Sequence, residues 1–470
     1  MRLSIRPTHL ALCLWLLGGV FSLLHTARPA VNRFGAEPDS ESKGRRGSGV
    51  VEEVVVGAPA GQGVTTPQPP TMGFAPQTRL GYHAGDQWEP AIAADRFGHI
   101  YLLYPQYLGV PGCPRCPSPT MVLQISDDHG ATWGAPAPIG APGSGQWDAQ
   151  IVVDPVNEQT VYAAWLQNNR SATVVARSDD FGATWSSVVA GEDAQRLTDK
   201  PILAARGQDV YVAFNRARHL YVAASHDGGA TFTTVEIPKE ERGWPLAGGG
   251  AVTPDGSVYF SWAGYLGGFE QTPVNLYLIK SADGGATWTT IPMDISTAGP
   301  DCSAYECGWA YLGAQIVLAS DEAGSLYALW NKGRQHGGPQ RIFFARSTDG
   351  GASWSDKVGV SVAPAGTGHA FPAIVAGSAG DVRISWMDAR EEGLWNTYYR
   401  SSMNGGLTWT PESDLSTYVP GFPYIEPHGF SFPFGDYFEL AIGERGMTHV
   451  VWGEGLNYDS PGSIWYTRGR

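Results

Sequence analysis

The chain contains a repeated unit of short strand-like stretches, and in four of the units an arginine follows the second stretch. These arginines are Arg170, Arg216, Arg334 and Arg390. A guanidinium binds a carboxylate through two parallel hydrogen bonds, so a ring of such groups favours a carboxylate-bearing ligand. An alternative interpretation is purely structural, with each arginine paired to a nearby acid, as Arg390 could be with Asp388.

Other polar and aromatic residues precede the first strand-like stretch of the same units. Trp88 and Trp147 can stack on sugar faces, and a carboxylate follows each of them directly; in the last unit a tyrosine follows an aspartate at the same place. Together with the arginines, the candidate binding residues are Trp88, Trp147, His369 and Asp436, and the candidate reactive residues are Glu89, Asp148 and Tyr437.

A repeated pair of short strands must position these side chains. Stretches such as residues 88–104, 147–165 and 371–386 each read as an apolar strand, a turn with Gly or Asp, and a second strand. A third strand follows, then a polar turn, then a fourth, outer strand. Seven such units can be counted, and the last one ends at Arg470 after its third strand.

The polar turn carries the pattern Ser-x-Asp-x-Gly-x-Thr-Trp, as in residues 281–288, SADGGATW. Its acid can accept hydrogen bonds from main-chain N–H groups downstream, Gly permits a positive φ, and Trp supplies apolar area. Because an active site is normally single, the repetition indicates a structural role. The acid or amide of each of the six copies is Asp128, Asp180, Asp227, Asp283, Asp349 and Asn404.

These six copies resemble the Asp-boxes, or BNR repeats, of the sialidase superfamily of β-propellers, and the resemblance spans residues 88–470. It implies an all-β fold: a single propeller of four-stranded blades. We predict seven blades, with six as the alternative. An N-terminal segment, either residues 52–58 or residues 72–80, would supply the missing outer strand and remove an open sheet edge.

The resemblance also places the ligand on the face opposite the boxes. It implies that Tyr437 is a nucleophile, that Glu426 or Glu306 is its partner, and that Glu89 or Asp148 is the acid/base. Arg216, Arg334 and Arg390 are then candidates for a carboxylate-binding triad. The chain departs from the family pattern in two ways: it lacks a Phe-Arg-Ile-Pro motif before the first box, and its tyrosine lies in a Gly-Asp-Tyr-Phe context.

Two functions of different classes follow. The first is a secreted, sialidase-like exo-glycosidase acting on acidic glycans, or, as a variant, a polysaccharide lyase that uses His369 or a tyrosine as base. The second is a non-catalytic propeller that serves as an extracytoplasmic binding or assembly module. The expected ligand is a glycan or another acidic small molecule, and we expect a monomer.

Composition agrees with a large turn-rich β-domain: 470 residues include 61 Gly and 34 Pro, and 11% are aromatic. The net charge of −14 argues against nucleic acid or an anionic membrane as partner. No histidine spacing or EF-hand loop indicates a metal site, so no cofactor is expected, although loop carboxylates could hold calcium.

The N-terminal region reads as targeting sequence. Residues 1–30 combine Arg2 and Arg6 with an apolar run over residues 10–24, which predicts a signal peptide or an uncleaved anchor. Residues 31–80 read as a Pro/Gly-rich, mostly disordered linker, and residues 81–470 as the propeller. Export is consistent with two local disulfides, Cys113–Cys116 and Cys302–Cys307; a redox or zinc role for the first pair is the alternative.

Overall fold

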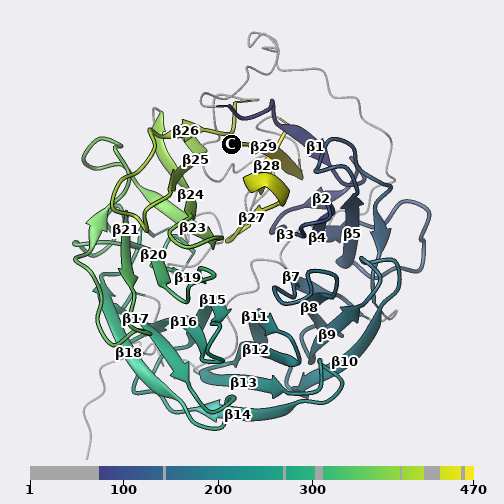
Figure 1. The fold of residues 1–470 in the computed structure, drawn as a ribbon, viewed down its shortest axis with the longest axis horizontal. Coiled ribbons are helices and arrows are strands. Elements are labelled where there is room, and N and C mark those ends of the chain that lie inside the picture. Colours follow the sequence, from purple (N-terminus) through teal and green to yellow (C-terminus); the bar gives the residue numbers. More distant parts are fainter. Residues whose placement is uncertain are drawn as a thin grey trace, which may run out of the picture. The chain divides into compact units, whose positions relative to one another are not determined.

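The computed structural model describes residues 73–140, 144–267, 271–301, 311–391, 394–417, 435–456 and 461–470. The predicted leader, most of the linker and the candidate strand at residues 52–58 lie outside them. In the described part of the chain, seven antiparallel sheets are arranged around a common axis (Figure 1). The prediction of an all-β propeller with seven blades is confirmed, and the six-bladed alternative is wrong.

Each blade has its first strand at the axis and its fourth at the rim. The strands of blades 1 to 4, from inside outward, are β3 (Ala91–Ala94), β4 (Ile100–Tyr107), β5 (Thr120–Ser126) and β6 (Ala137–Pro138); β7 (Trp147–Val153), β8 (Val161–Gln167), β9 (Ala172–Ser178) and β10 (Ser186–Glu192); β11 (Thr198–Arg206), β12 (Asp209–Arg216), β13 (His219–Ser225) and β14 (Thr233–Ile237); β15 (Pro245–Val252), β16 (Val258–Tyr265), β17 (Val274–Ser281) and β18 (Thr289–Ser296).

A short additional strand, β2 (Asp86–Gln87), pairs with β4 in blade 1. Blades 5 to 7 follow the same plan as blades 1 to 4. Blade 5 contains β19 (Ile316–Ser320), β20 (Leu326–Lys332), β21 (Arg341–Ser347) and β22 (Val358–Gly359), and blade 6 contains β23 (His369–Ala376), β24 (Val382–Glu391), β25 (Leu394–Ser402) and β26 (Ser413–Asp414). Blade 7 contains β27 (Glu439–Ile442), the 3-10 turn η2 (Glu444–Gly446), β28 (Thr448–Gly455), β29 (Gly462–Gly469) and β1 (Thr78–Leu80).

Blade 7 is completed by the N-terminal end of the described chain. Strand β1 pairs antiparallel with β29, with Thr78 opposite Tyr466 and Leu80 opposite Ile464. This strand lies within the segment 72–80. Pairing of the two chain ends in one sheet covers an edge that would otherwise expose unpaired N–H and C=O groups.

The apolar core of the described residues is divided into eight clusters, each lying between two neighbouring blades; the junction of blades 1 and 2 holds two of them. One cluster joins blades 1 and 2 around Trp165, and another joins blades 7 and 1, where Leu80, Ile92 and Val451 meet. The aromatic residue of each box is only half-buried, so the sequence analysis overestimated its contribution. The tryptophans that are fully buried are those of the second strands: Trp165, Trp262, Trp330, Trp386 and Trp452.

Three of these second-strand indoles donate a hydrogen bond to the side chain two residues later. Trp165 donates to Gln167 at 2.8 Å, and Trp386 to Asp388 at 2.8 Å. Trp452 donates to Glu454 at 2.7 Å. A residue that follows a second strand is therefore often an indole partner inside a blade rather than a ligand contact.

The boxes form the hydrogen-bonded turns that their residue types predict. In the fourth copy, Ser281 donates to Asp283 at 2.7 Å and accepts from Gly285 N–H at 2.8 Å. The Asp283 carboxylate accepts from the hydroxyl and the main chain of Thr287, which lowers its pKa to about 2. The box of blade 1 lies beside the turn between its first two strands, since His129 N–H donates to Gly98 C=O at 2.9 Å. All boxes therefore share the face of those turns, called here the box face.

Basic residues that end the third strands bind blades to one another. Arg177 of blade 2 donates to Gly228 C=O in the box of blade 3, at 3.0 Å. Lys280 of blade 4 makes the same contact with Gly350 C=O of blade 5, at 3.0 Å. Arg346 and Arg468 repeat it from blade 5 to blade 6 and from blade 7 to blade 1. The last contact spans the closure of the ring.

Cys113 and Cys116 form a disulfide in the β4–β5 connection, as predicted. Cys302 and Cys307 lie outside the described residues. None of the helical structure found in the described ranges is long and apolar enough to cross a membrane.

The box hydroxyl can be tested directly. Ser281 is 1% exposed and its hydroxyl makes three hydrogen bonds, so Ser281→Ala leaves the buried Gly285 amide without its acceptor. We expect the free energy of unfolding to fall by about 1–3 kcal/mol. Chemical denaturation measures it. Ser355→Ala, on the exposed turn after the fifth box, is the control and should change stability far less; equal effects of the two changes would refute the prediction.

Glu454 offers a second test, because burial raises the pKa of its carboxyl to about 8. Its folded-state pKa exceeds the unfolded value, so the stability contributed by the protonated form is lost as pH rises through about 8. Glu454→Gln places in blade 7 the amide that Gln167 provides in blade 2; it removes this loss and still accepts the indole hydrogen bond. Thermal unfolding should therefore show a variant that matches the unaltered chain near pH 5 and melts at a higher temperature above about pH 8. A lower melting temperature at both values would contradict the assignment.

Candidate functional site

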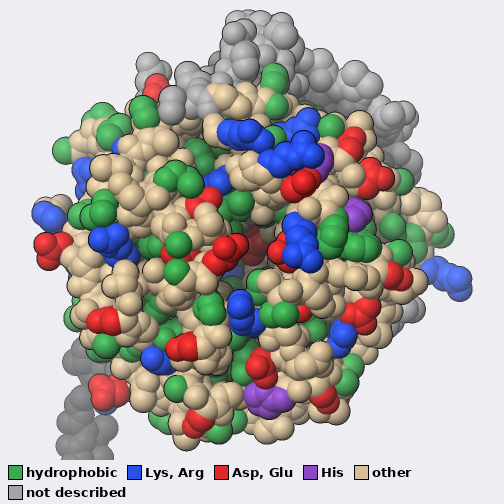
Figure 2. All heavy atoms as spheres, in the orientation of Figure 1, with side chains coloured by type: hydrophobic (Ala, Val, Ile, Leu, Met, Phe, Trp, Pro, Cys, Tyr) green, Lys and Arg blue, Asp and Glu red, His purple; other side chains and the backbone are tan. Residues whose placement is uncertain are grey.

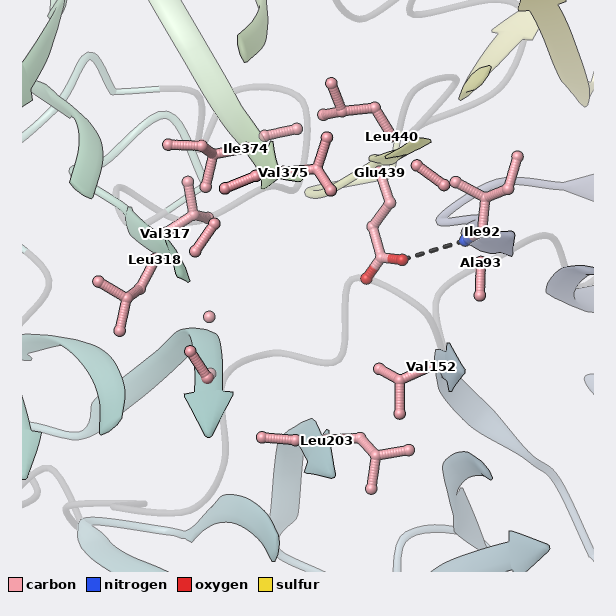
Figure 3. Close-up of a pocket in the computed structure, with 18 of the residues that line it drawn as sticks. Ile92, Ala93, Val152, Leu203, Val317, Leu318, Ile374, Val375, Glu439 and Leu440 are labelled. Carbon is pink, nitrogen blue, oxygen red and sulfur yellow. Dashed lines mark hydrogen bonds between the residues drawn. The ribbon is translucent and has the colours of Figure 1, made fainter. Parts of the chain in front are cut away.

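A cavity of about 900 Å³ runs along the inner strands. It is lined by aliphatic side chains from all seven blades, among them Val152, Leu203, Val317 and Ile374 (Figure 3). On the face drawn in Figure 2, acidic and basic side chains gather around the central hollow. The apolar middle and the charged ends divide the cavity into regions of different chemistry.

Glu439 is the ionisable side chain at the middle of the cavity. Its carboxylate accepts from Ile92 N–H at 3.0 Å and from Gln150 Nε2 at 2.7 Å, linking blades 7, 1 and 2 (Figure 3). Burial raises the pKa of Glu439 to about 7, although both hydrogen bonds act to lower it. Because both carboxylate oxygens already accept hydrogen bonds from the fold, its role is structural.

Four residues at the starts of inner strands have a left-handed backbone. Glu89, Asp148, Lys200 and Phe371 have φ of 55°, 56°, 47° and 52°, and three of them lie where the pairing with the second strand is shifted by a bulge. A left-handed conformation in a residue other than glycine costs about 1–3 kcal/mol and clusters at functional sites. Three of these four residues are charged.

The three charged members meet at the end of the cavity opposite the box face. Lys200 Nζ donates to Asp436 Oδ1, and Lys200 N–H donates to Asp148 Oδ2 at 3.3 Å. The Glu89 carboxylate accepts from Asp436 N–H at 3.0 Å. We call Glu89, Asp148, Lys200 and Asp436 the acid–lysine site.

The two sides of this site have opposed electrostatics. Burial raises the pKa of Asp148 to about 7, against the opposing effect of Lys200, and its Oδ1 has no hydrogen-bond partner among the described residues. Burial would lower the pKa of Lys200, but Asp436, Glu89 and the two neighbouring aspartates outweigh burial and hold it well above its usual value. Near neutral pH, Asp148 can therefore give up a proton while Lys200 stays charged.

Two tyrosines border the acid–lysine site. The Lys200 ammonium lies 5.0 Å from the centre of the Tyr437 ring, and the Tyr437 hydroxyl is 3.4 Å from Ala149 C=O. Tyr311 donates to Gly435 C=O, and burial together with Asp436 and Glu89 raises its pKa. Of the predicted residues, Asp148, Asp436 and Tyr437 line the cavity, and Glu89 is bonded to Asp436.

The predicted ring of arginines does not converge on a ligand position. Arg390 is bound by Asp388 and Glu412, in agreement with the structural alternative. Arg216 lies over the ring of Tyr221 at 4.7 Å, and Arg334 is exposed. Of the four, Arg170 is the one that acts on the acid–lysine site, where its charge lowers the pKa of Asp148. The carboxylate-binding triad from Arg216, Arg334 and Arg390 is therefore wrong.

Three other predicted binding residues are buried in the fold. Trp88 stacks on Tyr107 with ring centres 4.6 Å apart, and Trp147 packs in the same apolar cluster. His369 is 1% exposed, is bonded to Gln340 and Thr367 carbonyls and to Ser361, and has its pKa lowered by burial. These side chains support the site wall or blade 6 instead of facing a ligand. Glu426 and Glu306 lie outside the described residues.

Lys200 is the member of the site to which the sequence analysis assigned no role. A signal for it exists in the aligned tetrapeptides at residues 89–92, 148–151, 200–203 and 371–374, which read EPAI, DAQI, KPIL and FPAI. The first residue of each is the left-handed one. In the described residues no group of three or more His, Cys, Asp or Glu is suited to hold a metal ion.

No family model matches the chain. It is 27% identical over 256 residues to a xyloglucanase of Paenibacillus sp., which covers 49% of this chain and 23% of the relative. It is 24% identical over 320 residues to a probable oligoxyloglucan-reducing end-specific xyloglucanase of Neosartorya fischeri, covering 60% of this chain and 36% of the relative. The matched region is thus about a quarter to a third of the length of these relatives.

Solved structures share the fold at low sequence identity. A polysaccharide lyase of family PL25, an ulvan lyase bound to a GlcA–Rha3S unit, superposes with a TM-score of 0.50 at 12% identity over 82% of this chain and 95% of the lyase. The NanB sialidase of Streptococcus pneumoniae superposes with a TM-score of 0.44 at 12% identity over 84% and 70% of the two chains. At 12% identity, the likeness to the lyase shows a shared fold alone.

The buried Asp148 carboxyl, whose Oδ1 has no hydrogen-bond partner among the described residues, is predicted to lower the stability of the fold at alkaline pH. Its raised pKa means that stability contributed by the protonated form is lost as pH rises through about 7. Asp148→Asn keeps an oxygen for Lys200 N–H, tolerates the left-handed backbone and cannot ionise. Thermal unfolding should show a more stable variant at about pH 8, by on the order of a few kcal/mol, and near equality only below about pH 4, the pKa of an unfolded aspartate. A destabilised variant at both values would rule this out.

Proposed function

We propose that the protein is a secreted glycoside hydrolase that cleaves glycan chains at the acid–lysine site. The observation that carries the proposal is the pair Asp148 and Asp436, both lining the cavity mouth and both in contact with Lys200. Glycosidases need one carboxyl that donates a proton and one that stays ionised, in environments that differ. Secretion is supported by the leader-like sequence and by the Cys113–Cys116 disulfide.

The roles follow from the environments. The protonated carboxyl of Asp148, with its pKa near 7, gives its proton to the departing glycosidic oxygen as the C–O bond breaks. Asp436, held by the Lys200 ammonium, is the carboxylate that attacks the anomeric carbon or takes a proton from the attacking water. Tyr437 lies against Lys200 and helps to form the wall of the substrate site.

The substrate we propose is an uncharged glycan. An acidic sugar would require free guanidiniums, whereas Arg390 is bound by two carboxylates and Arg216 is stacked on aromatic rings. The Glu89 and Asp436 carboxylates beside the one buried lysine would also repel a carboxylate ligand. The two curated relatives are named for xyloglucan, a neutral polysaccharide, which supports this choice.

The test is release of reducing ends by the full chain from neutral β-glucans, including xyloglucan, and from sialylated and uronic acid-containing glycans. We expect turnover on a neutral glucan, an alkaline limb of kcat/KM near pH 7 as Asp148 loses its proton, and a loss of about 10²-fold or more in Asp148→Asn and in Asp436→Asn.

Glu454→Gln is the matched control, since it removes another buried carboxyl of raised pKa away from the cavity and should leave kcat unchanged. Turnover confined to acidic glycans would refute the substrate class. If the chain binds glycans but turns over no substrate, the hydrolase proposal is refuted and the non-catalytic binding module becomes the supported function.

A further inference from the structure

Lys200 has a strained backbone conformation that directs its side chain to the cavity wall. It lies at the start of β11 with φ of 47°, next to a shift in the β11–β12 pairing, and it precedes Pro201. Glu89 and Asp148 hold the equivalent positions in blades 1 and 2. A flexible, strongly hydrated side chain is an unexpected choice for a cavity wall, and its side chain is only 12% exposed.

The same residue touches both carboxyl groups assigned to catalysis, but in different ways. Its ammonium binds Asp436 as an ion pair, whereas only its main-chain N–H binds Asp148, at 3.3 Å. The Tyr437 ring covers the ammonium at 5.0 Å. Asp436 therefore pairs directly with the ammonium, whereas Asp148 is bonded to a neutral main-chain donor and is influenced by the same positive charge without a direct ion pair.

The charged groups around Lys200 and Asp148 come from blades 1, 2, 3 and 7. They are Glu89 before β3, Asp148 in β7, Asp199 beside Lys200 in β11, Asp436 before β27, and Arg170 in the β8–β9 turn, with the hydroxyls of Tyr311 and Tyr437 close by. Because these acids raise the pKa of Lys200, its amine remains protonated and cannot serve as a nucleophile at neutral pH.

We propose that Lys200 is a positioning residue that fixes Asp436 as the carboxylate and leaves Asp148 as the proton donor of the hydrolytic reaction. The inference rests on the proposed function. During cleavage the Asp148 proton passes to the leaving oxygen, and the Asp436 carboxylate bonds to the anomeric carbon or accepts a proton from water. The ammonium keeps its three protons throughout and gives up none of them.

The test compares Lys200→Met, which removes the charge at similar length, with Lys200→Arg, which keeps it. In Lys200→Met we expect kcat to fall by about 10²-fold with KM within a few-fold. The alkaline limb of kcat/KM should move upward by about one pH unit or more, because Asp148 loses a nearby positive charge. Lys200→Arg should keep the limb in place and retain most of kcat.

A purely structural lysine would lower kcat without moving the limb, and this result would overturn the proposal. Lys200→Gln, which keeps a donor for Asp436 without the charge, should show the same shift and serves if Lys200→Met does not fold.

A second measurement does not depend on turnover. The difference in melting temperature between the unaltered chain and Asp148→Asn, measured against pH, reports the titration of Asp148. The same difference is then measured in a chain that carries Lys200→Met or Lys200→Gln. The pH midpoint of this titration should be higher in that background. An unchanged midpoint refutes the role of Lys200 whether or not the chain is active. A risen midpoint in a chain that cleaves nothing refutes the hydrolase alone.

Discussion

The propeller depends on hydrogen bonds that join one blade to the next through the boxes. Arg177, Lys280, Arg346 and Arg468 each end a third strand and donate to a carbonyl in the following blade's box. The box serine and acid hold that carbonyl in place by satisfying the amides of the turn. A motif that looks local in sequence is thus the acceptor for a contact between blades, and Arg468 applies it across the junction of the two chain ends.

Closure of the ring determines what the inner strands can do. Their second strands and the inter-blade clusters hold them on one side, and their other edge faces the cavity. Glu439 and Gln150 use part of that edge to link blades, with Ile92 N–H and Leu203 N–H as their donors. At the end opposite the boxes, strain in the backbone turns Glu89, Asp148 and Lys200 toward one another instead of along the strands.

Much of the architecture could be predicted because it repeats. Six boxes and seven strand pairs determine the fold class and the blade count. Glu89, Asp148, Asp436 and Tyr437 were proposed from the face opposite the boxes, and the fold brings them together beside the cavity. The arginines were misassigned because sequence spacing does not reveal partners: Asp388 must satisfy the Trp386 indole, and Arg390 then compensates its charge. Lys200 was given no role because its importance comes from contacts with residues 52 and 236 positions away.

The left-handed position at the start of four of the inner strands has a further consequence. It carries Glu, Asp, Lys and Phe in four blades that share one backbone, so its geometry tolerates side chains of opposite charge and of very different size. The propeller therefore has several equivalent positions around one end of the cavity, and each of them accepts different side chains. New specificities can then arise by substituting one of these residues at a time, without a change in the blades that surround the cavity.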